Sequence, residues 1–250
     1  MTAADRVVLG AKREDVLKDE DKRRTAIHEA GHALCGWLEP DSDPLVKVTI
    51  VPRGRGLGVT QFMPDDDQLK LSEEQLKAHL VVCMGGRAAD KLVSNEATSG
   101  ASQDLKQATR VARMMITQFG MSDKLGPVSY RIGEEHVFLG KEIQDARDFS
   151  EGTMQLIDEE VRRILNTALD RATSHLTTHR KELDLLTQGL LLREELSKDE
   201  VEMILKAGNL DVLPPIVLDE PSPTAAAPAK VVETPAPTEV PSSLRPFPAV

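Results

Sequence analysis

Two histidines and a glutamate lie close together near the start of the chain, in the segment RTAIHEAGHALCGWLEP. In its HEAGH pattern His28 and His32 are four positions apart, and Glu29 directly follows the first histidine. On a helix, this spacing puts both imidazoles on one face, so that they can point at a single metal ion. Zinc prefers imidazole nitrogen, and a catalytic zinc keeps one position for a water whose pKa it lowers. Glu29 would then take a proton from that water during peptide-bond hydrolysis.

The alternative is that two unrelated histidines happen to fall at this spacing. Small residues surround them, at Ala30, Gly31 and Ala33, and these leave room for other groups to approach a metal. The three fixed positions of the HExxH pattern, placed on a predicted helix, therefore favour a metal site.

Two histidines are one ligand short of a catalytic zinc site. The longer pattern HExxHxxGxxH would supply a third histidine, but Cys35 replaces its glycine and Leu38 its last histidine, which excludes that class. Asp104 begins a predicted helix, where the helix dipole keeps a carboxylate ionised, although such an aspartate can also serve the dipole alone. Spacing leaves the third ligand open among Asp65, Asp66, Asp67, Glu73, Glu74, His79, Asp90, Glu96 and Asp104.

The HEAGH segment is predicted to lie in the middle of a helix. This helix begins at Asp21 as its N-cap and ends at Glu39, because Pro40 cannot continue it. Alternating β-branched residues then predict a strand at 45–52 and another at 59–63, joined by the glycine-rich turn RGRGLG.

Helical spacing of apolar residues dominates the rest of the chain. Ser72 and Gln75 form a capping box at the start of one helix, and Ser197 caps another. The fold class is therefore expected to be mainly α with a small β-sheet. Beyond the HEAGH helix, the predicted helices cover residues 72–93, 104–120, 149–178 and 197–208.

Composition narrows the partners and the compartment. The net charge of −10 argues against nucleic acid as a partner, because phosphate binding needs a concentrated positive surface. Cys35 and Cys83 are too few for a disulfide framework, which fits a reducing compartment. The sequence shows neither a signal peptide nor an apolar run long enough to span a bilayer, so a cytoplasmic location is expected.

A resemblance to the peptidase domain of the FtsH-type ATP-dependent zinc proteases is carried by five segments in order, namely HEAGHAL, KVTIVPRGRGLGVTQFMP, GGRAAD, TSGASQDLKQAT and QFGMSDKLGPVSY. It covers about residues 5–208. The resemblance implies that His28, His32 and Asp104 hold a zinc ion and that Glu29 is the catalytic base. It also implies a helical zinc-peptidase domain with HExxH on a central helix.

The same resemblance implies how substrate is held. An extended peptide is expected along a strand edge, in the β-augmentation mode, at Gly56, Gly58, Val59 and Thr60. The implied function is that of a zinc metalloendopeptidase that hydrolyses peptide bonds of unfolded or damaged proteins. Two alternatives stay open, namely an assembly or scaffold module of a hexameric ring with little activity, and a freestanding zinc peptidase with a different third ligand.

The resemblance and the composition together predict the domain organisation. Residues 1–20 look like the end of an AAA module, residues 21–210 form the zinc peptidase domain, and the proline-rich tail at 211–250 is expected to be disordered. The family works as homo-hexamers with an AAA ATPase module, which is expected in the same chain or in a partner chain. If the chain is part of a full-length family member, membrane anchoring with the peptidase on the cytoplasmic side is expected.

Overall fold

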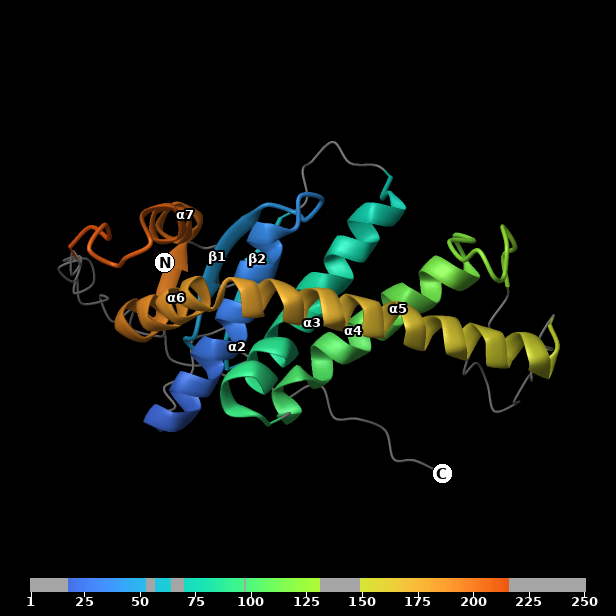
Figure 1. Ribbon diagram of the computed structural model, residues 1–250, viewed down its shortest axis with the longest axis horizontal. Helices are drawn as coiled ribbons and strands as arrows, with labels where there is room; N and C mark the ends of the chain where they lie inside the picture. Colours follow the sequence, from blue (N-terminus) through green and yellow to red (C-terminus); the bar gives the residue numbers. More distant parts are fainter. Residues whose placement is uncertain (1–17, 53–56, 64–69, 97, 131–148, 216–250) are drawn as a thin grey trace, which may run out of the picture. The chain divides into compact units, whose positions relative to one another are not determined.

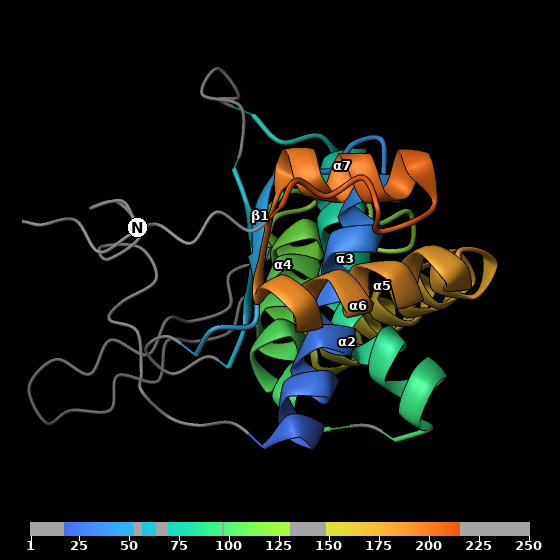
Figure 2. The same ribbon diagram turned by 90° about the vertical axis from the view of Figure 1, so that its left-hand side faces the viewer.

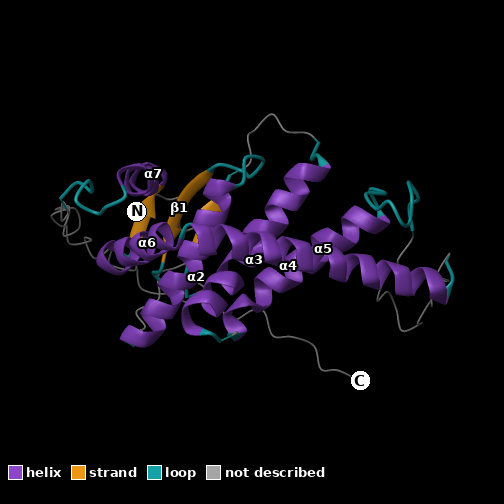
Figure 3. Cartoon of the chain, viewed as in Figure 1, coloured by secondary structure: helices purple, strands orange, loops and turns teal. Residues whose placement is uncertain are grey.

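The computed structural model describes residues 18–52, 57–63, 70–96, 98–130 and 149–215. Helices dominate this part of the chain and a small sheet accompanies them (Figure 3), which confirms the predicted fold class. None of the described helices combines the length and apolar character that a bilayer crossing requires. In chain order the elements are α2 (Asp19–Leu38), β1 (Leu45–Thr49), β2 (Val59–Phe62), α3 (Glu73–Ser94), the 3-10 helix η1 (Ser99–Ala101), α4 (Ser102–Thr117), α5 (Glu151–Thr178), α6 (Arg180–Arg193), β3 (Glu195–Ser197) and α7 (Lys198–Ala207) (Figure 1).

Helix α2 carries the HEAGH segment and begins earlier than predicted. Its N-cap is Lys18, so the prediction of Asp21 as the cap is wrong. Asp21 lies instead in the first turn with two further acids, where negative charge favours the helix dipole. Its carbonyl accepts a hydrogen bond of 2.8 Å from the Thr25 hydroxyl.

Helices α2 and α3 lie alongside each other at very close range (Figures 1 and 2). A Cβ atom on Gly31 would lie 2.5 Å from the Gly85 carbonyl oxygen and 2.6 Å from the Ala89 Cβ. Real Cβ atoms do not approach backbone this closely, so the two glycines are what allows these helices to touch. Gly31 on α2 and Gly85 on α3 thus permit the close packing of the two helices.

The sheet lies to one side of α2 and α3 (Figure 2). Its strand order is β2-β1-β3, and both pairings are antiparallel, with Val48 opposite Thr60 on one side and Leu196 on the other. The strand pair β1 and β2 was predicted, whereas β3 and α6 were not. Helix α6 does carry helical spacing in Leu183, Leu186 and Leu190, all of which are buried.

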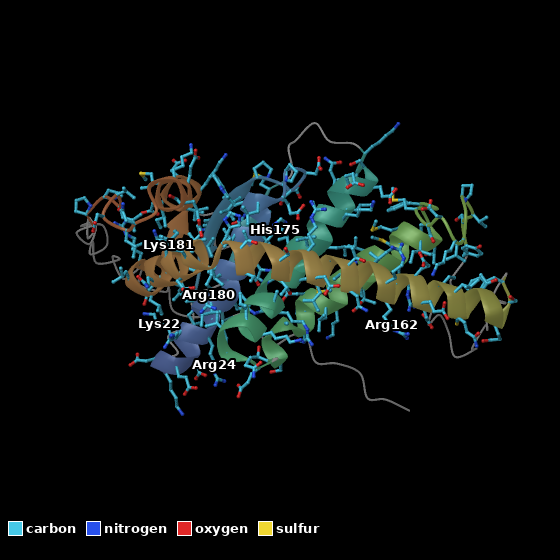
Figure 4. All side chains as sticks on the ribbon, viewed as in Figure 1. Lys22, Arg24, Arg162, His175, Arg180 and Lys181 are labelled. Carbon is cyan, nitrogen blue, oxygen red and sulfur yellow. The ribbon has the colours of Figure 1, made fainter. Side chains whose placement is uncertain are left out.

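Helix α5 holds the C-terminal end of α2 through a buried acid. Glu39, the C-cap of α2, pairs with Arg171 at 2.7 Å and with His175 at 2.8 Å. Figure 4 labels His175 on α5. This contact anchors the helix that carries the HEAGH segment. The predicted domain boundaries at residues 20 and 210 stay predictions, since most residues beyond them lie outside the described ranges.

Candidate metal centre and active site

Three predicted ligands from two helices meet at one point. His28 and His32 lie on α2, and their Nε2 atoms are 3.1 Å apart. Asp104, in the first turn of α4, places Oδ2 3.3 Å from Nε2 of His28 and 3.6 Å from Nε2 of His32. Within the described ranges, this is the one group of three histidine, cysteine or carboxylate side chains arranged to hold a metal ion.

The other ring nitrogens are held by a second layer of contacts. Nδ1 of His28 lies 3.0 Å from Oδ2 of Asp90, and Nδ1 of His32 lies 2.7 Å from the Val82 carbonyl oxygen. Since both acceptors need a proton, each histidine carries it on Nδ1 and leaves Nε2 free as a ligand. Asp90 is held in turn by the Thr98 hydroxyl, which donates at 3.0 Å. Sequence reasoning counted Asp90 among the candidate ligands and missed Val82 and Thr98.

The three ligand atoms fit a tetrahedral zinc ion. Ligand atoms about 2.1 Å from a tetrahedral zinc lie roughly 3.4 Å from one another. The three distances between the ligand atoms of His28, His32 and Asp104 range from 3.1 to 3.6 Å. Two imidazole lone pairs and a carboxylate repel one another unless a positive charge lies between them, so the donor set itself calls for a cation.

The carboxylates around His28 also favour a positive charge at this position. Burial disfavours its protonated form, but the carboxylates of Asp104 and Asp90 outweigh that effect and raise the pKa of His28 to about 10. For Asp104, burial acts in the opposite direction and favours a higher pKa. Its hydrogen bonds with His28 and His32 outweigh burial and hold the pKa of Asp104 well below the usual range. The same carboxylates would favour a metal cation bound to His28, and metal binding requires the unprotonated Nε2.

Space for the ligands comes from a glycine on α3. A Cβ atom on Gly86 would lie 2.5 Å from Nε2 of both His28 and His32. Any side chain at this position would push into the ligand atoms themselves. The neighbouring Gly85 serves the α2 and α3 contact, so the pair of adjacent glycines has two separate tasks.

Glu29 is buried beside the three candidate ligands and is held by the start of β2. Its Oε2 accepts a hydrogen bond of 2.6 Å from the Thr60 hydroxyl. A Cβ atom on Gly58 would lie 2.7 Å from Oε1 of Glu29, so a side chain there would displace this carboxylate. Burial raises the pKa of Glu29, although the neighbouring histidines and Thr60 oppose this. A carboxyl with a raised pKa is suited to accept and return a proton near neutral pH.

The predicted substrate residues are partly visible. Gly58 precedes β2, and Val59 and Thr60 form its first two positions, half-buried, whereas Gly56 lies outside the described residues. Among the described strands, β2 pairs only with β1, so its other edge has no strand beside it. The role of these four residues in binding substrate stays a prediction.

Other partners are seen for the three remaining glutamates on the candidate list. Glu73 and Glu74 pair with Lys77, and Glu96 lies 3.8 Å from Arg24. Asp65, Asp66 and Asp67 lie outside the described residues. Cys35, which is not among the nine candidates, is fully buried where α2 meets α3, and burial raises the pKa of its thiol to about 12.

The sequence pattern of peptidase family M41 matches residues 15–204, more than half of the chain. The chain belongs to peptidase family M41. This membership confirms the resemblance on which the sequence analysis relied, and it makes the domain a peptidase by class.

Similar proteins from several bacteria share this part of the sequence. The chain is 49% identical over 203 residues to ATP-dependent zinc metalloprotease FtsH 1 of Rhodopirellula baltica, covering 81% of this chain and 30% of that protein. It is 48% identical over 212 residues to ATP-dependent zinc metalloprotease FtsH of Nitrosococcus oceani, covering 85% and 33%. A third relative, FtsH 4 of Sphaerobacter thermophilus, is 48% identical over 205 residues, covering 82% and 31%. The chain thus spans about a third of the length of these relatives.

Proposed function

We propose that this chain is the proteolytic domain of an FtsH-type protease and that it uses zinc to hydrolyse peptide bonds in unfolded or damaged proteins. The observation that carries the proposal is the convergence of His28, His32 and Asp104, with Glu29 held directly beside them. The relatives are named as zinc metalloproteases, which supports zinc as the ion.

Each residue has a distinct task in this proposal. His28, His32 and Asp104 hold the ion, which when bound supplies a polarised water and stabilises negative charge on the substrate carbonyl. Glu29 accepts the proton of the attacking water and later delivers it to the leaving amine. Thr60 keeps the Glu29 carboxylate in position through its 2.6 Å hydrogen bond. Asp90 and the Val82 carbonyl fix the orientation of the two imidazoles.

The open edge of β2 is suited to hold an extended peptide. Main-chain hydrogen bonds along an edge strand bind a peptide without regard to its sequence, which fits an enzyme for unfolded proteins. The start of β2 also contacts Glu29 through Gly58 and Thr60. A peptide that extends this strand would therefore pass the base. A folded protein has few free extended segments, so the chain is expected to depend on a separate unfolding activity.

That unfolding activity is expected from an AAA ATPase module in the same chain or a partner chain, because the relatives are named as ATP-dependent. A homo-hexamer, with the peptidase domains on the cytoplasmic side of a membrane anchor, is part of the same proposal.

Two substitutions test the proposed roles on the full 250-residue chain. Glu29→Gln should keep bound zinc but lose cleavage of unfolded casein and of a flexible peptide. Asp104→Asn should weaken both zinc binding and cleavage, whereas the exposed Asp158→Asn should change neither. Cleavage that survives Glu29→Gln would overturn the base assignment. Normal zinc content in Asp104→Asn would favour a peptidase with another third ligand, and a zinc-loaded parent without cleavage would favour an assembly module.

A further inference from the structure

A second group of metal-binding side chains lies between α3 and α4, outside the site described above. Nε2 of His79 lies 3.6 Å from Sγ of Cys83, one helical turn further along α3. The side-chain amide of Gln107 on α4 lies 3.0 Å from the same Nε2 atom. A thiol sulfur and a side-chain amide therefore both lie within contact distance of the same imidazole nitrogen.

The distance between Nε2 of His79 and Sγ of Cys83 is the one that a shared zinc ion requires. A nitrogen about 2.05 Å and a sulfur about 2.3 Å from a tetrahedral zinc lie roughly 3.5 Å apart. The observed 3.6 Å between His79 and Cys83 needs almost no adjustment. Histidine and cysteine four positions apart on a helix are also neighbours on one face, so the helix itself sets this geometry.

The protonation state of His79 suits a ligand. When the amide nitrogen of Gln107 faces Nε2 and donates to it, Nε2 must be the unprotonated ring nitrogen and carry the lone pair. Burial lowers the pKa of His79, although the charge of Asp43 opposes this, so the ring is neutral at pH 7. A half-turn of the Gln107 amide would present its oxygen at the same place as a third ligand.

The thiol is inert until a metal arrives. Cys83 is 7% exposed, and burial together with the charge of Asp104 raises the pKa of its thiol to about 12. A free Cys83 therefore stays protonated and is a poor nucleophile. A thiophilic cation changes this, because it forms a metal–sulfur bond as the S–H bond breaks and the proton passes to solvent. No electron is transferred in this exchange.

We propose that His79, Cys83 and Gln107 form a second metal site that binds Zn²⁺ or its thiophilic analogue Cd²⁺. It is separate from the first group, since it shares no residue with it. Gln107 lies three positions after Asp104 on α4, and Cys83 lies three positions before Gly86 on α3. A cation bound here and a cation bound by His28, His32 and Asp104 would repel each other, so the second site should fill after the first and bind more weakly.

Cadmium titration of the full 250-residue chain, already loaded with one equivalent of zinc, tests the proposal. Binding of Cd²⁺ to a thiolate produces an ultraviolet charge-transfer absorption, whereas a site of two histidines and an aspartate produces none. The expected result is such an absorption that saturates at one equivalent of Cd²⁺. It should be absent in Cys83→Ser and present in Cys35→Ser, which removes the other buried thiol.

A second variant guards against misfolding. His79→Asn keeps both thiols and changes a half-buried side chain, so its circular dichroism should match that of the parent. Its affinity for Cd²⁺ should fall by at least about tenfold. The proposal is overturned if the parent shows no thiolate absorption, if Cys83→Ser keeps it, or if His79→Asn binds as tightly as the parent. These results are independent of whether the chain cleaves peptides.

Discussion

Replacing Gly86 with alanine should separate metal binding from stability. The new Cβ atom would lie 2.5 Å from Nε2 of His28 and of His32. Carbon and nitrogen atoms in ordinary contact are about 3.5 Å apart, so the two rings would have to retreat by about 1 Å. Their far nitrogens are held by Asp90 and the Val82 carbonyl, which leaves them little freedom to do so.

The substitution should lower zinc affinity strongly but leave the stability of the metal-free chain almost unchanged. Metal–ligand distances tolerate about 0.2 Å, so a 1 Å displacement should lower zinc affinity by at least about 100-fold, and cleavage should fall with it. Alanine is favoured over glycine within a helix by about 0.5 to 1 kcal/mol, which partly offsets the strain. The metal-free Gly86→Ala chain should therefore unfold at a similar denaturant concentration to the metal-free parent.

Zinc affinity is measured by competition with a chromophoric chelator, and stability by urea unfolding of the metal-free chain. The matched control is Gly152→Ala on α5, where a Cβ atom meets only the Ser150 hydroxyl at 3.7 Å. This control should keep parental zinc affinity and activity. If Gly86→Ala bound zinc within a factor of about three of the parent, the proposed crowding of the ligand atoms by a Cβ atom would be refuted.

Two further predictions concern the base and a buried acid. Thr60→Val should lower kcat for a flexible peptide by about tenfold with zinc content unchanged, because Glu29 loses its 2.6 Å hydrogen bond. The control Thr60→Ser keeps the hydroxyl and should keep most activity. An unchanged kcat in Thr60→Val would contradict this role of Thr60. Hydrogen bonds from Arg163, Lys124 and Ser122 lower the pKa of Glu160 to about 2. The ionised Glu160 therefore stabilises the fold at pH values above about 4.3, the ordinary pKa of a glutamate in the unfolded chain. This contribution is lost as the pH falls from about 5 toward 2. Glu160→Gln should therefore cost about 1 to 2 kcal/mol at pH 7 and flatten the loss of stability toward acid, measured by urea unfolding, and an acid dependence equal to that of Glu159→Gln would contradict it.

The local half of the candidate site could be predicted from the sequence, whereas the distant half could not. His28, Glu29 and His32 lie on one helix, where the helical repeat alone fixes their geometry. Asp104 comes 76 positions after His28, and spacing left it among nine candidates until the family resemblance selected it. Asp90 and Asp104 both contact His28, on opposite ring nitrogens, and no sequence pattern tells which nitrogen each carboxylate will meet.

Of the two described elements that were not predicted, α6 carries local apolar spacing that could have indicated it, whereas β3 depends on distant contacts. Strand β3 has only three residues, and it exists because β1 pairs with it from far away in the chain. Such a short segment carries no periodicity of its own. The long helices, by contrast, were predicted to within a few residues, since their caps and apolar spacing are local. Ser72 and Ser197 form the capping boxes of α3 and α7.

The most direct test of the central proposal is the position of zinc in a crystal of the chain prepared with one equivalent of the metal. Anomalous scattering at the zinc absorption edge locates the ion without any assumption about its ligands. The proposed site predicts one peak, about 2.0 to 2.2 Å from Nε2 of His28, Nε2 of His32 and a carboxylate oxygen of Asp104. A peak that lacks Asp104 as a ligand, or that lies away from both histidines, would contradict it.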